Sequence, residues 1–157
     1  MYNIYNITSR IPNRESIVSF REKIAWAAFV TTLLAWGGYF AVVIAHAVNG
    51  DTHDPMLFWL FLAAMIGQTV LIVAVAIVSA ILAPGDAHAA PDERDRRVGQ
   101  RASALAYGVV LVAIAAVIVW LHLGLHGVNT IFALIGVFIL GEAVRFGAKA
   151  IGYRAAG

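Results

Sequence analysis

The chain has 157 residues, of which 61% are hydrophobic and 13% are charged. Soluble domains have about 45–50% apolar and about 25% charged residues, so this composition excludes an ordinary water-soluble globule. The sequence contains no cysteine, which excludes disulfides, iron–sulfur clusters and a cysteine nucleophile. A formal net charge of +2 is too small to indicate nucleic acid as a partner.

Four stretches are long and apolar enough to cross a lipid bilayer, which takes about 20 predominantly apolar residues. They are residues 24–48, 56–82, 102–125 and 128–151, and none of them contains proline. The pieces outside these spans are too short for a soluble catalytic domain. The sequence therefore predicts an all-α integral membrane protein, a four-helix bundle over residues 24–151 with tails at 1–23 and 152–157.

The N-terminal tail is polar and has no apolar segment with a signal-peptide cleavage site. Residues 14–23 predict either a short helix at the membrane surface, with Ile17, Val18 and Phe20 inserted, or a weakly ordered polar tail.

The basic residues indicate the orientation of the spans. All 11 Lys and Arg residues precede the first span, separate the second from the third, or follow Gly141 in the fourth span and the C-terminal tail. The opposite loops carry only Asp51 and Asp54 as charged residues. Because cytoplasmic loops are enriched in Lys and Arg, we expect both termini in the cytoplasm, an N-in/C-in topology. The short connection at His126 and Gly127 predicts an antiparallel hairpin of the last two spans.

Small residues predict where helices approach closely. Pairs at four-residue spacing are Ala41 with Ala45, Ala63 with Gly67, Ala76 with Ala80, and Ala102 with Ala106. Gly141, Gly147 and Gly152 make the last span a plausible contact surface. Gln68, near the middle of the second span, predicts a hydrogen bond to another helix, because a side-chain amide in lipid needs a partner.

Four of the five histidines lie at the predicted outer rim: His46, His53, His122 and His126. His122 and His126 have the i,i+4 spacing of a helical metal site, and Asp51, Asp54 and His53 would add ligands for a divalent metal. His46 and His122, on different spans at similar depth, are the pair that would ligate a haem iron. The favoured alternative is that these amphipathic rings occupy the membrane interface without any cofactor.

Glu142 is the only acidic residue inside a predicted span. An intramembrane carboxylate suggests a substrate or proton site in a small transporter, which would have to be dimeric to enclose a cavity. The favoured alternative is an ion pair with Arg145, three residues further along the same helix.

The segment 91–101 carries the densest cluster of charges. Asp92 and Glu93 favour the positive N-terminus of a helix that continues through Arg101 into the third span, with i,i+4 pairs from Asp92 to Arg96 and from Glu93 to Arg97. Arg94, Arg97 and Arg101 would then share one face, available to anionic headgroups or to a protein partner. The simpler alternative is a solvated helix start whose charges pair with one another.

Three fragments at predicted cytoplasmic helix ends carry a resemblance: residues 19–26, residues 92–95 with Arg101, and residues 141–146 with 153–154. With them the chain resembles a family of small bacterial inner-membrane proteins that have four predicted spans and no assigned reaction. The resemblance covers most of the chain except residues 1–18. It implies a multi-pass protein of the bacterial inner membrane, with a regulatory role, and supplies no catalytic residue.

The charged residues of these fragments would form one ionic layer that locks the helix ends together. Its members are Arg21, Glu22, Lys23, Asp92, Glu93, Arg94, Asp95, Arg101, Glu142 and Arg145. No enzyme motif occurs in the sequence. The sequence therefore favours a non-enzymatic protein that acts by helix packing with itself or with a partner. A haem or metal protein and a small transporter are the alternatives.

Overall fold

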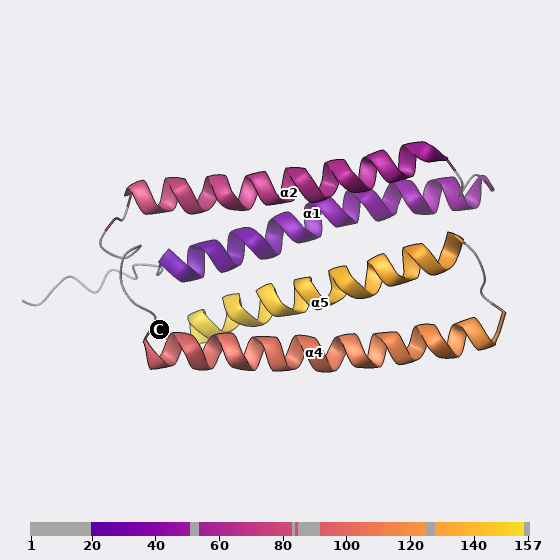
Figure 1. The fold of residues 1–157 in the computed structure, drawn as a ribbon. Helices are drawn as coiled ribbons and strands as arrows, with labels where there is room; N and C mark the ends of the chain where they lie inside the picture. The colour runs from indigo at the N-terminus through magenta and orange to yellow at the C-terminus, as the bar shows by residue number, and fades with distance from the viewer. Residues whose placement is uncertain (1–19, 51–53, 83, 85–91, 125–127, 156–157) are drawn as a thin grey trace, which may run out of the picture.

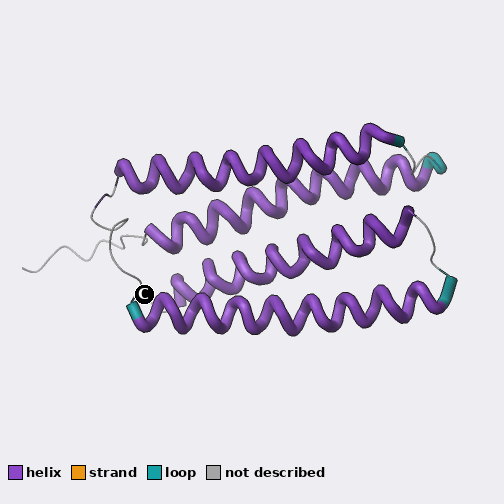
Figure 2. The backbone as a smooth tube through the Cα atoms, in the orientation of Figure 1, coloured by secondary structure: helices purple, strands orange, loops and turns teal. Residues whose placement is uncertain are grey.

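The computed structural model describes residues 20–50, 54–82, 84, 92–124 and 128–155, and four long helices make up most of these residues. They are α1 (Phe20–Val48), α2 (Pro55–Leu82), α4 (Glu93–His122) and α5 (Val128–Ala155). The described residues are helices joined by turns (Figure 2). All four helices are long and apolar enough to cross a membrane, as in a multi-pass membrane protein.

Local sequence explains where the helices begin and end. Asp54 accepts a hydrogen bond from the backbone nitrogen of Met56 at 2.8 Å, and Pro55 occupies the first helical position, where its missing N–H costs nothing. Asp92 and Asp95 form a capping box at the start of α4, each side chain accepting from the other residue's backbone nitrogen. Gly124 follows α4 with a φ of 110°, a conformation that favours glycine.

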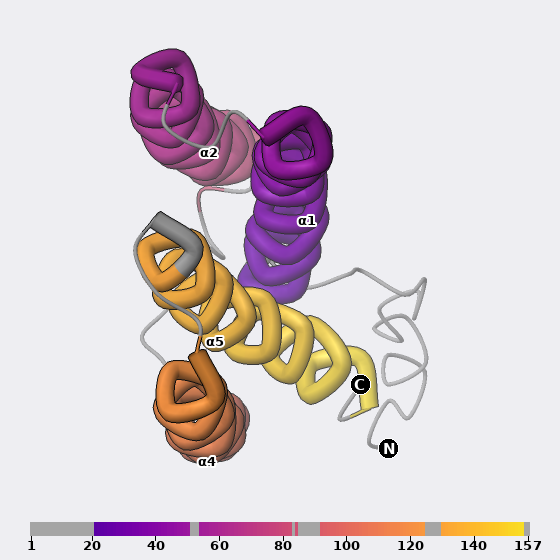
Figure 3. The backbone as a smooth tube through the Cα atoms, turned by 90° about the vertical axis from the view of Figure 1, so that its right-hand side faces the viewer, coloured from indigo at the N-terminus to yellow at the C-terminus, as the bar shows by residue number. Residues whose placement is uncertain are grey.

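The helices run up and down and form an open row. Figure 1 shows α1 and α4 running in one direction and α2 and α5 in the other. α4 packs against α5 as the predicted hairpin, and α1 packs against both α2 and α5. The end-on view shows the resulting order α2, α1, α5, α4, with α5 between α1 and α4 (Figure 3). The fold is thus a bundle in which α1 and α5 are central and α2 and α4 are peripheral.

An aromatic cluster joins α1 to α2. Trp36 and Tyr39 of α1 are buried and stack edge to face, with ring centroids 5.7 Å apart. Phe61 of α2 packs against both rings. Edge-to-face aromatic pairs contribute about 0.5–1.5 kcal/mol beyond the area they bury, so this cluster is a main contact between the two helices.

The glycines of α5 set its distance from both neighbours. A Cβ placed on Gly141 would lie 2.5 Å from Val110 of α4, and one on Gly152 would lie 2.9 Å from Val98 of the same helix. Gly136 and Gly147 instead face α1, against Phe40 at 3.6 Å and Phe29 at 3.0 Å. Each pair spans about three helical turns, so the four glycines form two stripes on different sides of α5. The single contact surface predicted for Gly141, Gly147 and Gly152 is therefore divided in two. Gly141 and Gly152 face α4, and Gly147 faces α1.

Candidate functional site

A polar cluster lies in the middle of the α1–α2 interface. Gln68 of α2 donates from its amide nitrogen to the Thr32 hydroxyl and accepts from the indole nitrogen of Trp36, both at 2.5 Å. Thr32 is completely buried and donates in turn to the carbonyl oxygen of Ala28. The predicted interhelical hydrogen bond of Gln68 is confirmed, and the cluster satisfies its own polar groups within the apolar region.

The sequence reasoning did not identify Thr32 and Trp36 as partners of Gln68. Their signal is the i,i+4 spacing, which places a hydroxyl and an indole on the same face of α1 as the buried Ala28 and Tyr39. That signal alone does not say which helix faces them, because the order of the helices in the row is a tertiary property.

In the last turn of α1, His46 is held by two partners. Its Nδ1 lies 3.0 Å from the carbonyl oxygen of Val42, and its Nε2 lies 3.5 Å from a carboxylate oxygen of Asp54. This contact closes the α1–α2 connection and brings together two of the predicted rim residues.

The other rim residues lie apart from this contact or outside the described part of the chain. His122 is exposed at the end of α4, with Nδ1 2.8 Å from the carbonyl oxygen of Ile118. α4 ends at His122, the first member of the predicted i,i+4 metal pair. Asp51, His53 and His126 fall in the segments that the structure does not describe.

The two histidines proposed for haem ligation sit on α1 and α4, with α5 between those helices (Figure 3). Among the described residues, no group of three or more His, Asp or Glu side chains is placed to hold a metal ion. The haem and metal interpretations therefore stay predictions from the sequence.

At the basic end of the bundle, charged residues connect three helices. Nε of Arg21 in α1 lies 3.3 Å from a carboxylate oxygen of Asp95 in α4. Arg94 of α4 donates to the backbone carbonyl of Tyr153 in α5, also at 3.3 Å. Among the described residues, these two contacts tie members of the predicted ionic layer to a different helix.

Other members of that layer pair within their own helix. Arg97 and Glu93 form the predicted i,i+4 pair at 2.6 Å, and both side chains are largely exposed. Asp92 acts as the N-cap of α4 and accepts from the Asp95 backbone, in place of the predicted pair with Arg96.

Glu142 pairs with Arg145 on α5, at 2.7 Å between carboxylate and guanidinium atoms. The Arg145 guanidinium also lies over the Phe146 ring, 4.9 Å from its centroid, and its buried Nε has no hydrogen-bond partner among the described residues. This geometry matches the self-neutralised ion pair that was the favoured interpretation of Glu142.

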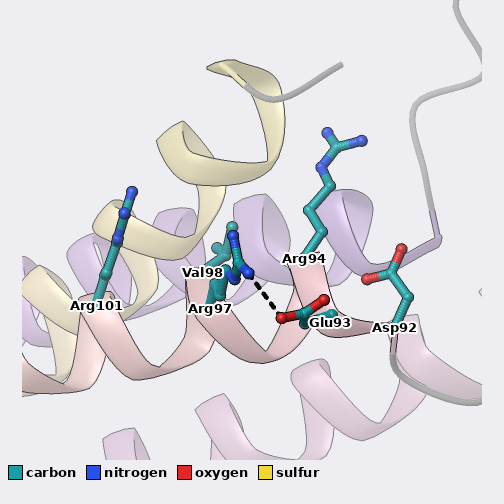
Figure 4. Close-up of a pocket in the computed structure, with 6 residues that line it drawn as sticks. All are labelled: Asp92, Glu93, Arg94, Arg97, Val98 and Arg101. Atoms are coloured by element: carbon teal, nitrogen blue, oxygen red, sulfur yellow. Dashed lines mark hydrogen bonds and ion pairs between the residues drawn. The ribbon is translucent and has the colours of Figure 1, made fainter.

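A hollow of about 470 Å³ lies at the start of α4, with three guanidinium groups in its lining. Its lining residues are Asp92, Glu93, Arg94, Arg97, Val98 and Arg101. Arg94 and Arg101 extend to the same side of the helix, and Arg97 turns toward Glu93 (Figure 4). The three arginines thus share a face, as the sequence predicted.

Comparison of the chain with protein-family models, with curated proteins and with solved structures finds no match.

Proposed function

We propose that this chain is a small non-enzymatic protein of the bacterial inner membrane, with both termini in the cytoplasm. It acts by packing its helices against a second copy or against a membrane or cytoplasmic partner, in a structural or regulatory role. The family resemblance of its helix-end fragments supports the bacterial inner membrane. The gathering of the basic residues at one end of the helices supports the cytoplasmic termini.

The observation that carries the proposal is the peripheral position of α2. This helix packs along α1, and no residue in its most apolar 18-residue stretch is buried. Ala63 and Gly67 are exposed on it, and a Cβ placed on Gly67 would have no atom within 4 Å. Such a surface leaves room for the backbone of another helix to approach closely.

Small residues at the same spacing are already buried within the bundle. Ala102 and Ala106 have the same four-residue spacing as Ala63 and Gly67, and they are buried in α4, the helix that packs on α5. Since equivalent small residues on α2 remain uncovered, α2 is the helix that we expect to receive a partner.

The test is subunit exchange between donor-labelled and acceptor-labelled copies of the full chain in lipid vesicles. Self-association predicts energy transfer that persists on dilution with lipid and falls strongly in Gly67→Leu, whose side chain would fill the α2 surface. The matched control is Gly108→Leu, at a second exposed glycine with open space around it on α4. Equal transfer in all three chains would contradict packing through α2, and random-collision transfer in all three would exclude self-association.

A further inference from the structure

Further along α4 than the arginine-lined hollow, a second hollow is an apolar groove lined by α4 and by Leu140 of α5. The groove has a volume of about 620 Å³, and its lining includes Ala104, Leu105, Gly108 and Val112 of α4 and Leu140 of α5. Positions 94, 97, 101, 104, 108 and 112 follow one another at steps of three or four residues, which places them on one helix face. The two hollows are therefore a charged and an apolar part of one surface.

Small residues form the floor of the groove. Gly108 has no side chain, and a Cβ at this position would have no atom within 4 Å. Ala104 also leaves room beside the larger Leu105 and Leu140. From Arg101 to Val112 the helix rises about 16 Å, about half of the ~30 Å hydrocarbon core, which is the depth that the acyl chains of one leaflet reach.

The charged part of the surface retains positive charge. Among the described residues, Arg94 donates to a neutral backbone carbonyl alone, and none makes a hydrogen bond or ion pair with Arg101. Arg97 is neutralised by Glu93, and the Asp92 carboxylate accepts from the first turn of α4. The N-terminus of the helix adds a partial positive charge at the same place.

The geometry points to a binding site for one anionic phospholipid, with its phosphate at Arg94 and Arg101 and one acyl chain in the groove over Gly108. Arginine binds phosphate through charge-assisted hydrogen bonds, and a basic group next to a span is attracted to anionic lipid headgroups. The site needs both of its parts, because a free phosphate would leave the groove empty and a neutral lipid would leave the charge unmatched. It does not depend on the association proposed for α2.

Native mass spectrometry of the full chain in mild detergent tests the site, with phosphatidylglycerol and phosphatidylcholine of the same acyl chains as probes. We expect the wild-type chain to retain one phosphatidylglycerol in preference to phosphatidylcholine. Arg101→Gln should bind phosphatidylglycerol about fivefold more weakly, because it loses one arginine contact near the membrane surface. Gly108→Leu should weaken the binding of both lipids, because its side chain would occupy the groove.

Two matched variants separate this site from general lipid adhesion. Arg96→Gln removes an exposed charge from α4 five residues from Arg101, about 140° around the helix, and Gly38→Leu fills open space on α1. Both should bind phosphatidylglycerol as the wild-type chain does. Equal losses in Arg96→Gln and Arg101→Gln, or in Gly38→Leu and Gly108→Leu, would overturn the proposal. Binding of inorganic phosphate as tight as that of the lipid would overturn the role of the groove.

Discussion

Trp36 of α1 donates a hydrogen bond from its indole nitrogen to the side-chain carbonyl of Gln68 in α2, across the interface of the two helices. The same amide donates to Thr32, so a single side chain of α2 is held at two points of α1. Two fixed points on neighbouring turns of a helix define both the register and the rotation of its partner. The pairing of α1 with α2 is therefore specified by polar contacts as well as by the aromatic cluster.

Gln68→Leu should lower the free energy of unfolding in detergent by about 1–2 kcal/mol, since interhelical hydrogen bonds in membranes contribute about 0.6–2 kcal/mol. The substitution replaces the polar amide by an apolar side chain of similar size and so removes both contacts. The control is Thr69→Val, because the Thr69 hydroxyl donates to the carbonyl of Met65 in its own helix. A loss in Thr69→Val as large as that in Gln68→Leu would contradict this account.

The close approach of α5 to α4 predicts that one substitution has opposite effects at two glycines. In Gly141→Ala the new Cβ would meet Val110 at 2.5 Å, so the stability in a detergent melt should fall by about 1–3 kcal/mol. In Gly38→Ala, at an exposed position of α1, the Cβ meets open space, and the gain in helix propensity, up to about 1 kcal/mol, should leave the chain at least as stable.

The cause of the Gly141 effect has its own check. In a chain that already carries Val110→Ala, the clashing methyl group is absent, so adding Gly141→Ala should no longer destabilise it. If Gly141→Ala is equally harmful with and without Val110, the close approach of α4 and α5 at this point is not its cause.

The sequence was sufficient for the four helices, the α4–α5 hairpin, the helix start at Asp92 and the Glu93–Arg97 and Glu142–Arg145 pairs. All of these depend on local patterns of apolar residues, caps and i,i+3 or i,i+4 spacing. The partners of Gln68 and the contact of His46 with Asp54 depend on which helices are neighbours, and apolar spans with similar compositions do not reveal their order. The two glycine stripes of α5 could likewise not be predicted from the sequence. Which glycine faces α1 and which faces α4 depends on the placement of these two helices around α5.

The ion pair between Arg21 and Asp95 joins the start of α1 to the start of α4, so it should stabilise the basic end of the bundle. A double-mutant cycle with Arg21→Gln and Asp95→Asn should give a coupling energy of about 0.5–1 kcal/mol that decreases with added salt. Both side chains are partly buried, at 28% and 20% exposure. The more exposed pair of Glu93 and Arg97 should show a smaller coupling in the same assay, and the reverse order would count against the predicted locking of helix ends.

The haem interpretation has a direct optical test. Because both ring nitrogens of His46 already have partners in Val42 and Asp54, we expect the purified chain to show only aromatic absorbance, in the oxidised state and after dithionite reduction. A Soret band that shifts on reduction, and that disappears in His46→Ala or His122→Ala, would replace the packing function with that of a membrane cytochrome.

The central claim is that the exposed surface of α2 at Ala63 and Gly67 packs against another protein. It is tested most directly by a photoreactive amino acid placed at Gly67 and, as the control, at Val73, which is exposed about 120° further around the same helix. After illumination of native membranes, the account predicts a discrete protein adduct from position 67, at twice the chain mass for a second copy, and none from position 73. Labelling of lipid alone at position 67, or equal protein labelling at both positions, would contradict it.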